Sequence, residues 1–367
     1  SQDYVEPGGT FTYDFTVPDA SFFWYHPHVM SAAQVGFGLY GPMLVEDPND
    51  GVDLETERIL VLSDIDVTPD NELESPETGG SAGMAFGREG NIVLVNGRQK
   101  PRVSIRPGET QRWRIVNAAK SRYFDLDAGE QHKVLQIGGD GGFLESSVEL
   151  PTVRLAPGER ADVILTPNGA PGTEIPVIAR LFDRGYGSTE ARMEEGIFSL
   201  VMSNEPAPPP VALPRITRDI APLDLAGAEP VAIEFNVAQD SVSKAFYYTI
   251  NGQSLGKFKP VQATTGTTQI WTITNPSPWS HPFHLHGFFF QVLDENNQPV
   301  RPLQWKDTVD VPYKKSVKVA VKYDDRPGLW MFHCHILDHA DGGLMAFLSL
   351  ARPGEAHPEP PPIEHSH

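Results

Sequence analysis

The sequence predicts an all-β protein with several domains of similar fold, and three observations support this prediction. First, the 367 residues include 34 prolines and 33 glycines, each about 9% of the chain against usual levels of about 5% and about 7%, which indicates many turns and short strands. Second, residues 10–17 place Phe11, Tyr13 and Phe15 at alternate positions, as in a half-buried strand. Third, one pattern of residues occurs twice. The length allows two or three domains with ample cores.

Along the chain, the expected strands are separated by linkers rich in proline, glycine or acidic residues. After residues 10–17, strands are expected at 22–25, 39–45 and 58–62, with a polar linker at 47–53 and a proline-rich connector at 205–210. These breaks predict the following segments: a first domain at 1–52, a second domain at 53–204, a proline-rich linker at 205–227, a third domain at 228–352 and a flexible tail at 353–367.

The repeated pattern relates the second predicted domain to the third. Each of three residues recurs 158 positions later (266 minus 108). The pairs are Gly108 and Gly266, Trp113 and Trp271, and Asn117 and Asn275. With one further residue allowed, FDLD at 124–127 aligns with FHLH at 283–286. The two domains should therefore share one fold, and since only the third carries histidines here, the second is predicted to be a metal-free copy.

Charge and cysteine content exclude several classes of protein. The formal net charge is −19 and the pI about 5.0, which argues against nucleic acid or an anionic membrane as a partner. The single cysteine rules out an internal disulfide and a four-cysteine zinc site. No run approaches the roughly 18 apolar residues needed to span a bilayer, and no signal peptide is visible in the 367 residues.

The one cysteine, Cys334, lies between His333 and His335. In an extended segment successive side chains point to opposite faces, so the two histidines would face one way and the cysteine the other. A thiolate is a soft ligand that suits copper, and imidazole suits copper, zinc and iron. One strand could thus serve two metal sites, with Cys334 covalently continuous with ligands of the second. This arrangement would be a built-in electron path.

Two further histidine motifs supply candidates for both sites. The segment HPFHLH begins at His281, and strand alternation places His284 and His286 on one face while His281 can face elsewhere. His26 and His28 form another HxH pair, expected on one face of a strand. Core histidines around an inert buried cysteine explain these clusters less well than metal ligands do.

The residue types narrow the choice of metal. One cysteine with two histidines and a weak or absent axial ligand is the ligand set of blue-copper electron-transfer sites, and His281 and His339 are the candidates to complete Cys334. Zinc is the rival, but six further clustered histidines exceed the needs of one tetrahedral zinc ion. A cysteine–histidine hydrolase is a third possibility, although it would not need repeated HxH motifs.

These motifs resemble those of the multicopper oxidases, specifically three-domain laccase-like enzymes. The matching segments are WYHPH (24–28), HPFHLHG (281–287) and HCHILDH (333–339) followed by GGLM, with WKDT (305–308) and RPGLW (326–330) as supporting context. The resemblance runs through nearly the whole chain. It implies cupredoxin-like Greek-key β-barrel or sandwich domains, three in tandem with the first incomplete.

The resemblance also implies four coppers and an oxidase activity. The implied ligands are His281, Cys334 and His339 for type 1 copper, His284 for type 2 copper, and His26, His28, His286, His333 and His335 for the type 3 pair. Members of the family take single electrons from a reducing substrate at type 1 copper and pass them through Cys334 to His333 and His335. They reduce O2 to water at a trinuclear cluster between the first and third domains. A periplasmic or secreted location is expected from the resemblance.

The sequence departs from the family pattern at three places. The axial position, five residues after His339, is Leu344, which cannot coordinate and should raise the reduction potential; Met345 is the alternative ligand. Some relatives have a glutamate directly after the last type 1 histidine, where this chain has Ala340, so that proton relay is in doubt. The family's earlier HxHG motif is not found in the 367 residues.

The third departure affects the expected copper content. Eight of the ten expected histidine ligands are present, and we expect a further N-terminal segment carrying HxHG to supply the other two. Without it, the chain should hold type 1 copper but a defective cluster.

The sequence is compatible with more than one class of reducing substrate. The seven methionines do not cluster, which favours phenols and aromatic amines over Cu(I). A manganese or iron oxidase would need carboxylates near His281 and His339, for which Asp338 and Asp341 are candidates. A copper-binding or electron-transfer protein without O2 reduction is the alternative from a different class.

Overall fold

The computed structural model describes residues 5–47, 50–52, 54–185, 194–211 and 218–360. The predicted linker at 205–227 and tail at 353–367 therefore lie partly outside the described residues. Within the described chain strands dominate, which confirms the all-β prediction. The three helices found there are short: α1 (Ser31–Gly36), α2 (Gly80–Phe86) and α3 (Leu337–Asp341). None of them is long and apolar enough to cross a bilayer.

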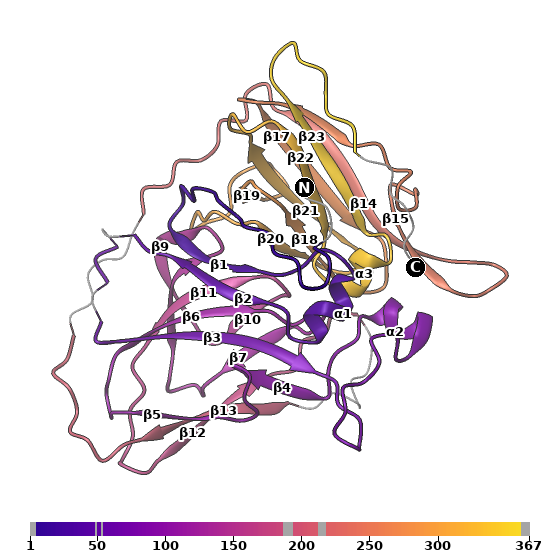
Figure 1. The fold of residues 1–367 in the computed structure, drawn as a ribbon. Coiled ribbons are helices and arrows are strands. Elements are labelled where there is room, and N and C mark those ends of the chain that lie inside the picture. The colour runs from indigo at the N-terminus through magenta and orange to yellow at the C-terminus, as the bar shows by residue number, and fades with distance from the viewer. Residues whose placement is uncertain (1–4, 48–49, 53, 186–193, 212–217, 361–367) are drawn as a thin grey trace.

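The N-terminal part contributes one small sheet. Strands β1 (Ser21–Tyr25) and β2 (Gly41–Val45) pair antiparallel, with Tyr25 opposite Gly41. Helix α1 lies between them in the sequence and packs against α3 at the other end of the chain. This contact brings residues near 30 beside residues near 340, as Figure 1 shows.

The middle part is a sandwich of two sheets. The six-stranded sheet has the order β4-β3-β6-β11-β8-β9 and the five-stranded sheet the order β10-β7-β12-β13-β5. The strands are β3 (Thr56–Ile65), β4 (Ile92–Val95), β5 (Arg102–Ile105), β6 (Gln111–Asn117), β7 (Phe124–Asp127), β8 (Val134–Gly139), β9 (Gly142–Leu150), β10 (Val153–Leu155), β11 (Arg160–Leu165), β12 (Glu174–Ala179) and β13 (Glu195–Met202). Buried apolar side chains, among them Trp113, Phe124 and Phe198, fill the space between the sheets.

The C-terminal part is a second sandwich of two five-stranded sheets, drawn in orange to yellow in Figure 1. Their orders are β15-β14-β17-β21-β19 and β16-β23-β22-β18-β20. The strands are β14 (Glu229–Gln239), β15 (Phe246–Ile250), β16 (Val261–Thr264), β17 (Thr268–Asn275), β18 (His281–Leu285), β19 (Phe290–Leu293), β20 (Thr308–Val311), β21 (Lys315–Lys322), β22 (Gly328–Cys334) and β23 (Met345–Ala351). Its core includes Trp271, Phe283 and Phe332, with the rings of Trp271 and Phe332 in edge-to-face contact.

The predicted repeat is confirmed in atomic detail. Trp113 donates its indole N–H to Gln111, and Trp271 donates to Gln269, two residues earlier in each strand. The Asn117 side chain donates to the carbonyls of Arg122 and Leu155 and accepts from the Ala119 N–H. The Asn275 side chain likewise donates to the carbonyls of Trp279 and Val311 and accepts from the Ser277 N–H.

The two sandwiches differ at the aligned FDLD and FHLH segments. In the middle sandwich, the carboxylates of Asp125 and Asp127 form ion pairs with Arg154 and Arg180. Salt bridges thus occupy the place that histidines take in the C-terminal sandwich. The predicted domain limits and the metal-free role of the second domain stay predictions.

Two local predictions about the first 30 residues are wrong. Residues 10–17 form no strand, and Phe11, Tyr13 and Phe15 are 46%, 66% and 63% exposed. No described strand pairs with their N–H and C=O groups, so the alternating pattern gains no sheet. His26 and His28 also lie outside a strand, because β1 ends at Tyr25 before a proline that lacks an N–H.

Candidate metal centres

Strands β18 and β22 bring two histidine motifs together. They pair antiparallel, with Phe283 opposite Cys334 and His284 opposite His333. His335 follows directly after β22, and His339 lies in α3. Because side chains alternate along both strands, the motif around Cys334 contributes to two separate clusters on opposite faces, as the alternation predicts.

The first cluster, here called the thiolate centre, consists of His281, Cys334 and His339. The two Nδ1 atoms lie 3.0 Å apart, and the Cys334 Sγ lies 3.5 Å from that of His281 and 3.6 Å from that of His339. Tetrahedral metal bonds of about 2.0 Å to nitrogen and about 2.3 Å to sulfur would separate these atoms by about 3.3 Å and about 3.5 Å. The spacing therefore fits one shared metal ion.

The outer ring nitrogens fix how the two imidazoles are turned. His339 Nε2 lies 3.2 Å from the carbonyl oxygen of Ala85, which can only accept, so Nε2 carries the proton. His281 Nε2 lies 2.8 Å from the Ser277 hydroxyl, whose own proton is directed to other acceptors. Both bare Nδ1 atoms consequently face the Cys334 sulfur. Two lone pairs 3.0 Å apart would repel each other without a cation between them.

The thiolate centre is closed to solvent. All three side chains are fully buried, and the ring of Tyr248 stacks on His339 with centroids 4.5 Å apart. The Tyr248 hydroxyl donates to the same Ala85 carbonyl that His339 contacts. Helix α2, from the middle part of the chain, thus covers the imidazole edge of His339.

Burial sets the protonation of the thiolate centre. It lowers the pKa of His281 to about 3 and that of His339 well below its ordinary value. Both imidazoles are therefore neutral, which is the form that binds metals. Burial also raises the pKa of the Cys334 thiol, so a metal ion would have to displace its proton.

The second cluster, here called the histidine centre, contains six imidazoles. Its members are His26, His28, His284, His286, His333 and His335, whose neighbouring rings have centroids 4.8–5.4 Å apart. Ring nitrogens of His28, His286 and His333 lie within 4.8 Å of one another, and the Nε2 atoms of His286 and His333 are 3.1 Å apart. The structure thus gathers every histidine that the sequence assigned to the type 2 and type 3 sites.

Backbone carbonyls orient three of these rings. His284 Nδ1 lies 2.9 Å from the Asp307 carbonyl, His333 Nδ1 lies 2.9 Å from the Cys334 carbonyl, and His26 Nδ1 lies 3.0 Å from the Pro27 carbonyl. Each Nδ1 therefore carries the proton and leaves Nε2 bare.

Two other nitrogens of the histidine centre have no protein partner. His28 Nε2 and His335 Nδ1 are buried and make no hydrogen bond. An unpartnered buried nitrogen is costly, and a metal ion would satisfy it. Burial lowers the pKa of His26 to about 4 and of His28 to about 2, so these imidazoles are neutral and available. The donor set fits metal ions.

The two centres are joined by the peptide between His333 and Cys334. The carbonyl of Cys334 accepts the Nδ1–H of His333 at 2.9 Å, in addition to the covalent link. His333 belongs to the histidine centre and Cys334 to the thiolate centre. The shortest connection between the two centres is therefore a single residue step.

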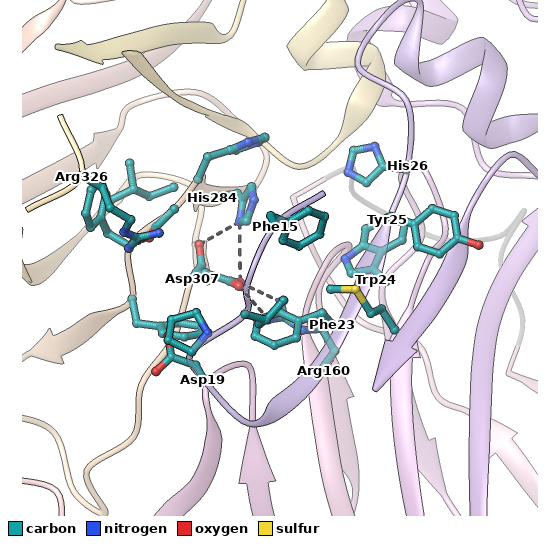
Figure 2. A pocket seen from close by; sticks show the side chains of 18 of the residues that line it. Phe15, Asp19, Phe23, Trp24, Tyr25, His26, Arg160, His284, Asp307 and Arg326 are labelled. Atoms are coloured by element: carbon teal, nitrogen blue, oxygen red, sulfur yellow. Dashed lines mark hydrogen bonds and ion pairs between the residues drawn. The ribbon is translucent and has the colours of Figure 1, made fainter. Parts of the chain in front are cut away.

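A cavity of about 400 Å³ opens beside the histidine centre. Its lining includes His26, His28, His284 and His335 together with Phe15, Trp24 and Tyr25. Figure 2 shows that segments distant in sequence, near residues 15, 25, 160, 284 and 307, converge on it. The imidazoles of the histidine centre can therefore be reached from outside, in contrast to those of the thiolate centre.

The position of Leu344 follows from the β22–β23 pairing. His333 lies opposite Met345, and the Cys334 N–H donates to the Leu344 carbonyl at 3.0 Å. Directly opposed residues of an antiparallel pair point to the same face. Leu344, which is fully buried, therefore shares the face of Cys334, whereas Met345 shares that of His333.

Three positioning contacts were not predicted from the sequence. The carbonyls of Ala85 and Asp307 lie against His339 and His284, respectively. The Arg160 guanidinium acts through a neighbour, because it donates to both carboxylate oxygens of Asp307. Only Asp307 carried a signal, as part of the WKDT segment. Every residue type has a backbone carbonyl, so the residue type at position 85 could not indicate that Ala85 contacts a histidine.

Comparison with known proteins supports a common origin for this architecture. Family models described as "Multicopper oxidase" match residues 1–50, 56–179 and 228–350. The chain belongs to the multicopper oxidase family. These family matches confirm the resemblance that the HxH motifs suggested, and the family is one of copper-containing oxidoreductases.

Among curated relatives of this multicopper oxidase, a laccase from Bacillus subtilis is 26% identical over 90% of the chain and 70% of its own length. The multicopper oxidase MmcO from Mycobacterium tuberculosis is 28% identical over 93% of the chain and 71% of its own length. A solved multicopper oxidase from Campylobacter jejuni, described as a metallo-oxidase, has a TM-score of 0.78 at 25% identity and covers 91% of this chain and 72% of that one. The likeness confirms the predicted cupredoxin-like fold.

Proposed function

We propose that this multicopper oxidase is a laccase-like enzyme that oxidises phenols or aromatic amines and reduces O2 to water. The thiolate centre would hold type 1 copper; at the histidine centre, His284 would hold type 2 copper and the other five histidines the type 3 pair. Copper, when bound, supplies one-electron redox chemistry and the site for O2. The observation that carries the proposal is the single-residue step from Cys334 to His333, which links a ligand set of one cysteine and two histidines to a cluster of six histidines.

The residues of the chain prepare both centres before any metal binds. Carbonyls and a hydroxyl set the ring nitrogens of His281, His284 and His339 so that lone pairs face inward. Such outer contacts fix ring orientation and raise ligand basicity. Burial in the core of the C-terminal sandwich keeps water away from the Cys334 sulfur, while the cavity of about 400 Å³ would give a small molecule such as O2 access to the histidine centre.

The same cavity has room for further ligands. His28 and His335 line it, and their Nε2 and Nδ1 atoms, respectively, have no hydrogen-bond partner. We propose that a segment carrying HxHG, outside the 367 residues, supplies two more imidazoles here. Four coppers per complete enzyme and a periplasmic or secreted location are part of the same proposal and rest on the family pattern.

Two carboxylates considered for a manganese or iron oxidase are already engaged. Asp338 is fully buried, pairs with Arg88 and accepts from the Arg88 N–H at 2.7 Å. Asp341 accepts from the Ala32 N–H at 2.8 Å. Asp338 is therefore not free to dock a metal-ion substrate, whereas Asp341 is exposed, so only one of the two candidate carboxylates could serve a metallo-oxidase activity.

The function is tested by copper content, absorption and O2 uptake with a phenol as donor. We expect the 367-residue chain to show the blue band of a copper–thiolate site, and O2 uptake to rise when a peptide carrying HxHG is added. A blue band without O2 uptake in either sample would indicate an electron-transfer protein. Full copper stoichiometry and turnover of the chain alone would refute the need for added histidines.

Leu344→Met is expected to lower the reduction potential of the thiolate centre. Leu344 shares the face of Cys334 and offers no ligand atom, whereas a thioether there could bind axially and stabilise the oxidised metal. Voltammetry of the copper-loaded protein measures the shift. The matched control is Met345→Leu, which alters the opposite face and should leave the potential unchanged. A rise in the potential with Met345→Leu, or no fall with Leu344→Met, would contradict Leu344 as the axial position.

A further inference from the structure

Four charged residues form a reciprocal pairing beneath the histidine centre. Lys306 and Asp307, adjacent in the chain, face Glu159 and Arg160, also adjacent. The Lys306 ammonium lies 3.1 Å from a Glu159 oxygen, and the Arg160 guanidinium lies 2.6 Å from an Asp307 oxygen. All four side chains are largely buried. Since none of them is a candidate metal ligand, the copper chemistry alone does not explain why these charges are buried here.

All the N–H groups of the Arg160 guanidinium donate hydrogen bonds. Its Nε donates to the Phe22 carbonyl at 3.0 Å, and its two terminal nitrogens donate to the Gly158 and Asp140 carbonyls at 3.0 and 2.9 Å. The same terminal nitrogens hold both Asp307 oxygens at 2.7 and 2.6 Å, a bidentate pair. The contacts reach β1, the middle sandwich and the C-terminal sandwich. A guanidinium is the one side chain that can do this, because its donors form a rigid fork.

One contact leads directly to His284. The carbonyl of Asp307, whose carboxylate Arg160 grips, accepts the Nδ1–H of His284 at 2.9 Å. The Thr308 hydroxyl lies 3.0 Å from the same nitrogen and donates to the Asp307 carboxylate. Figure 2 shows the chain of contacts from Arg160 through Asp307 to His284. Any turn of Asp307 would therefore turn the imidazole.

The other contacts reach two more histidines. Arg160 fixes the carbonyl of Gly158, and a Cβ at Gly158 would lie 2.7 Å from the His335 ring, so this loop packs directly on His335. Arg160 also fixes the Phe22 carbonyl in β1, the strand that leads into His26. The three segments held by one guanidinium thus lead into or contact histidines of all three motifs.

We propose that Arg160 is a positioning residue of the histidine centre, which fixes the tautomer and orientation of His284 through Asp307 and the position of His335 through Gly158. The part of this inference that concerns copper binding rests on the proposed function. The part that concerns the His284 tautomer is independent of it, because the tautomer is a property of the metal-free protein.

The competing explanation is that Arg160 and Asp307 only stabilise the fold. A second buried pair provides the matched control, because Arg112 donates to both oxygens of Asp162 at 3.0 and 2.6 Å on the outer face of the six-stranded sheet of the middle sandwich. Arg112 and Arg160 are equally buried, each 2% exposed in the side chain. Replacing either by lysine keeps the charge and removes the fork. Both variants should lose comparable stability, and only one should affect the histidines.

The test compares Arg160→Lys, Asp307→Asn and Arg112→Lys. In metal-free protein, imidazole nitrogen NMR should show His284 as the Nδ1–H tautomer in the wild type and in Arg112→Lys, but as a mixture in the other two. In Cu(II) titrations, Arg160→Lys should bind about 10- to 100-fold more weakly at the histidine centre, with the blue band of the thiolate centre unchanged. Asp307→Asn should act in the same direction.

Two results would overturn the proposal. One is an unchanged His284 tautomer and unchanged Cu(II) affinity in Arg160→Lys. The other is an equal change in Arg112→Lys, which would show a general effect of stability. If wild-type protein takes up no Cu(II) at the histidine centre even with the HxHG peptide added, the proposed function fails, and the NMR comparison still decides the role of Arg160.

Discussion

Cys334→Ser is expected to abolish the blue absorption and to reduce O2 uptake with a phenol to the level of a copper-free sample. The thiolate sulfur is the soft ligand at 3.5–3.6 Å from both facing Nδ1 atoms, and a serine hydroxyl neither ionises at neutral pH nor binds copper comparably. The substitution also removes the sulfur ligand from the residue that is covalently bonded to His333. Electrons would then have no entry point to the histidine centre.

The effect should be confined to the thiolate centre. Serine is close in size to cysteine, and the Ile336 N–H that now points to Sγ at 3.4 Å can donate to the hydroxyl, so the fold should persist. We expect circular dichroism and Cu(II) binding at the histidine centre to remain as in the wild type. Retained O2 uptake in Cys334→Ser would mean that electrons enter elsewhere, and the proposed path would be wrong.

The ligand clusters were predictable because their information is local. His284 and His286, like His333 and His335, are two residues apart, and the period of a strand puts such pairs on one face whatever the rest of the fold does. The repeat of Trp113 and Asn117 in the third domain was readable for the same reason, since each side chain serves its own strand or turn.

The features that could not be predicted from the sequence depend on contacts between segments that are distant in the chain. Residues 10–17 have the pattern of a strand, but a strand forms only where a neighbour can pair with it, and the described chain offers none there. The cover of His339 by Ala85 joins positions 254 residues apart. The pairing of Arg160 with Asp307 spans 147 residues. Opposite charges at such separations occur throughout an acidic chain, so residue types alone could not single out this pair.

The contrast between the two centres bears on how substrate and oxygen reach them. The thiolate centre lies beneath α2, with its His339 edge against the Ala85 carbonyl, while the histidine centre borders a cavity. Under the proposed function, an electron could cross the α2 backbone without the donor touching an imidazole, whereas O2 would have to reach the metal held by the histidines directly. Precise placement of the imidazoles therefore has its largest consequence at the histidine centre.

Gly158→Ala is accordingly expected to reduce O2 uptake about 100-fold, the effect of roughly a 1 Å displacement in a catalytic site. A Cβ at this position would lie 2.7–2.9 Å from three atoms of the His335 ring, which is 1% exposed. The ring would have to move, and its distances to His26 and His284 would change. Copper stoichiometry and O2 uptake in the presence of the added HxHG peptide measure the loss, and the blue band should remain.

The backbone at Gly158 adds a second cost that must be separated from the first. Its φ of +88° is unfavourable for any residue with a Cβ. Gly172 has a φ of +82° with nothing within 4 Å of its added Cβ, so Gly172→Ala carries the same backbone penalty without touching a histidine. Both variants should lose about 1 kcal/mol of unfolding free energy from the backbone, but only Gly158→Ala should lose copper at the histidine centre. Equal loss of activity in both would assign the effect to backbone strain, and the close packing of Gly158 on His335 would then have no role in placing the ligand.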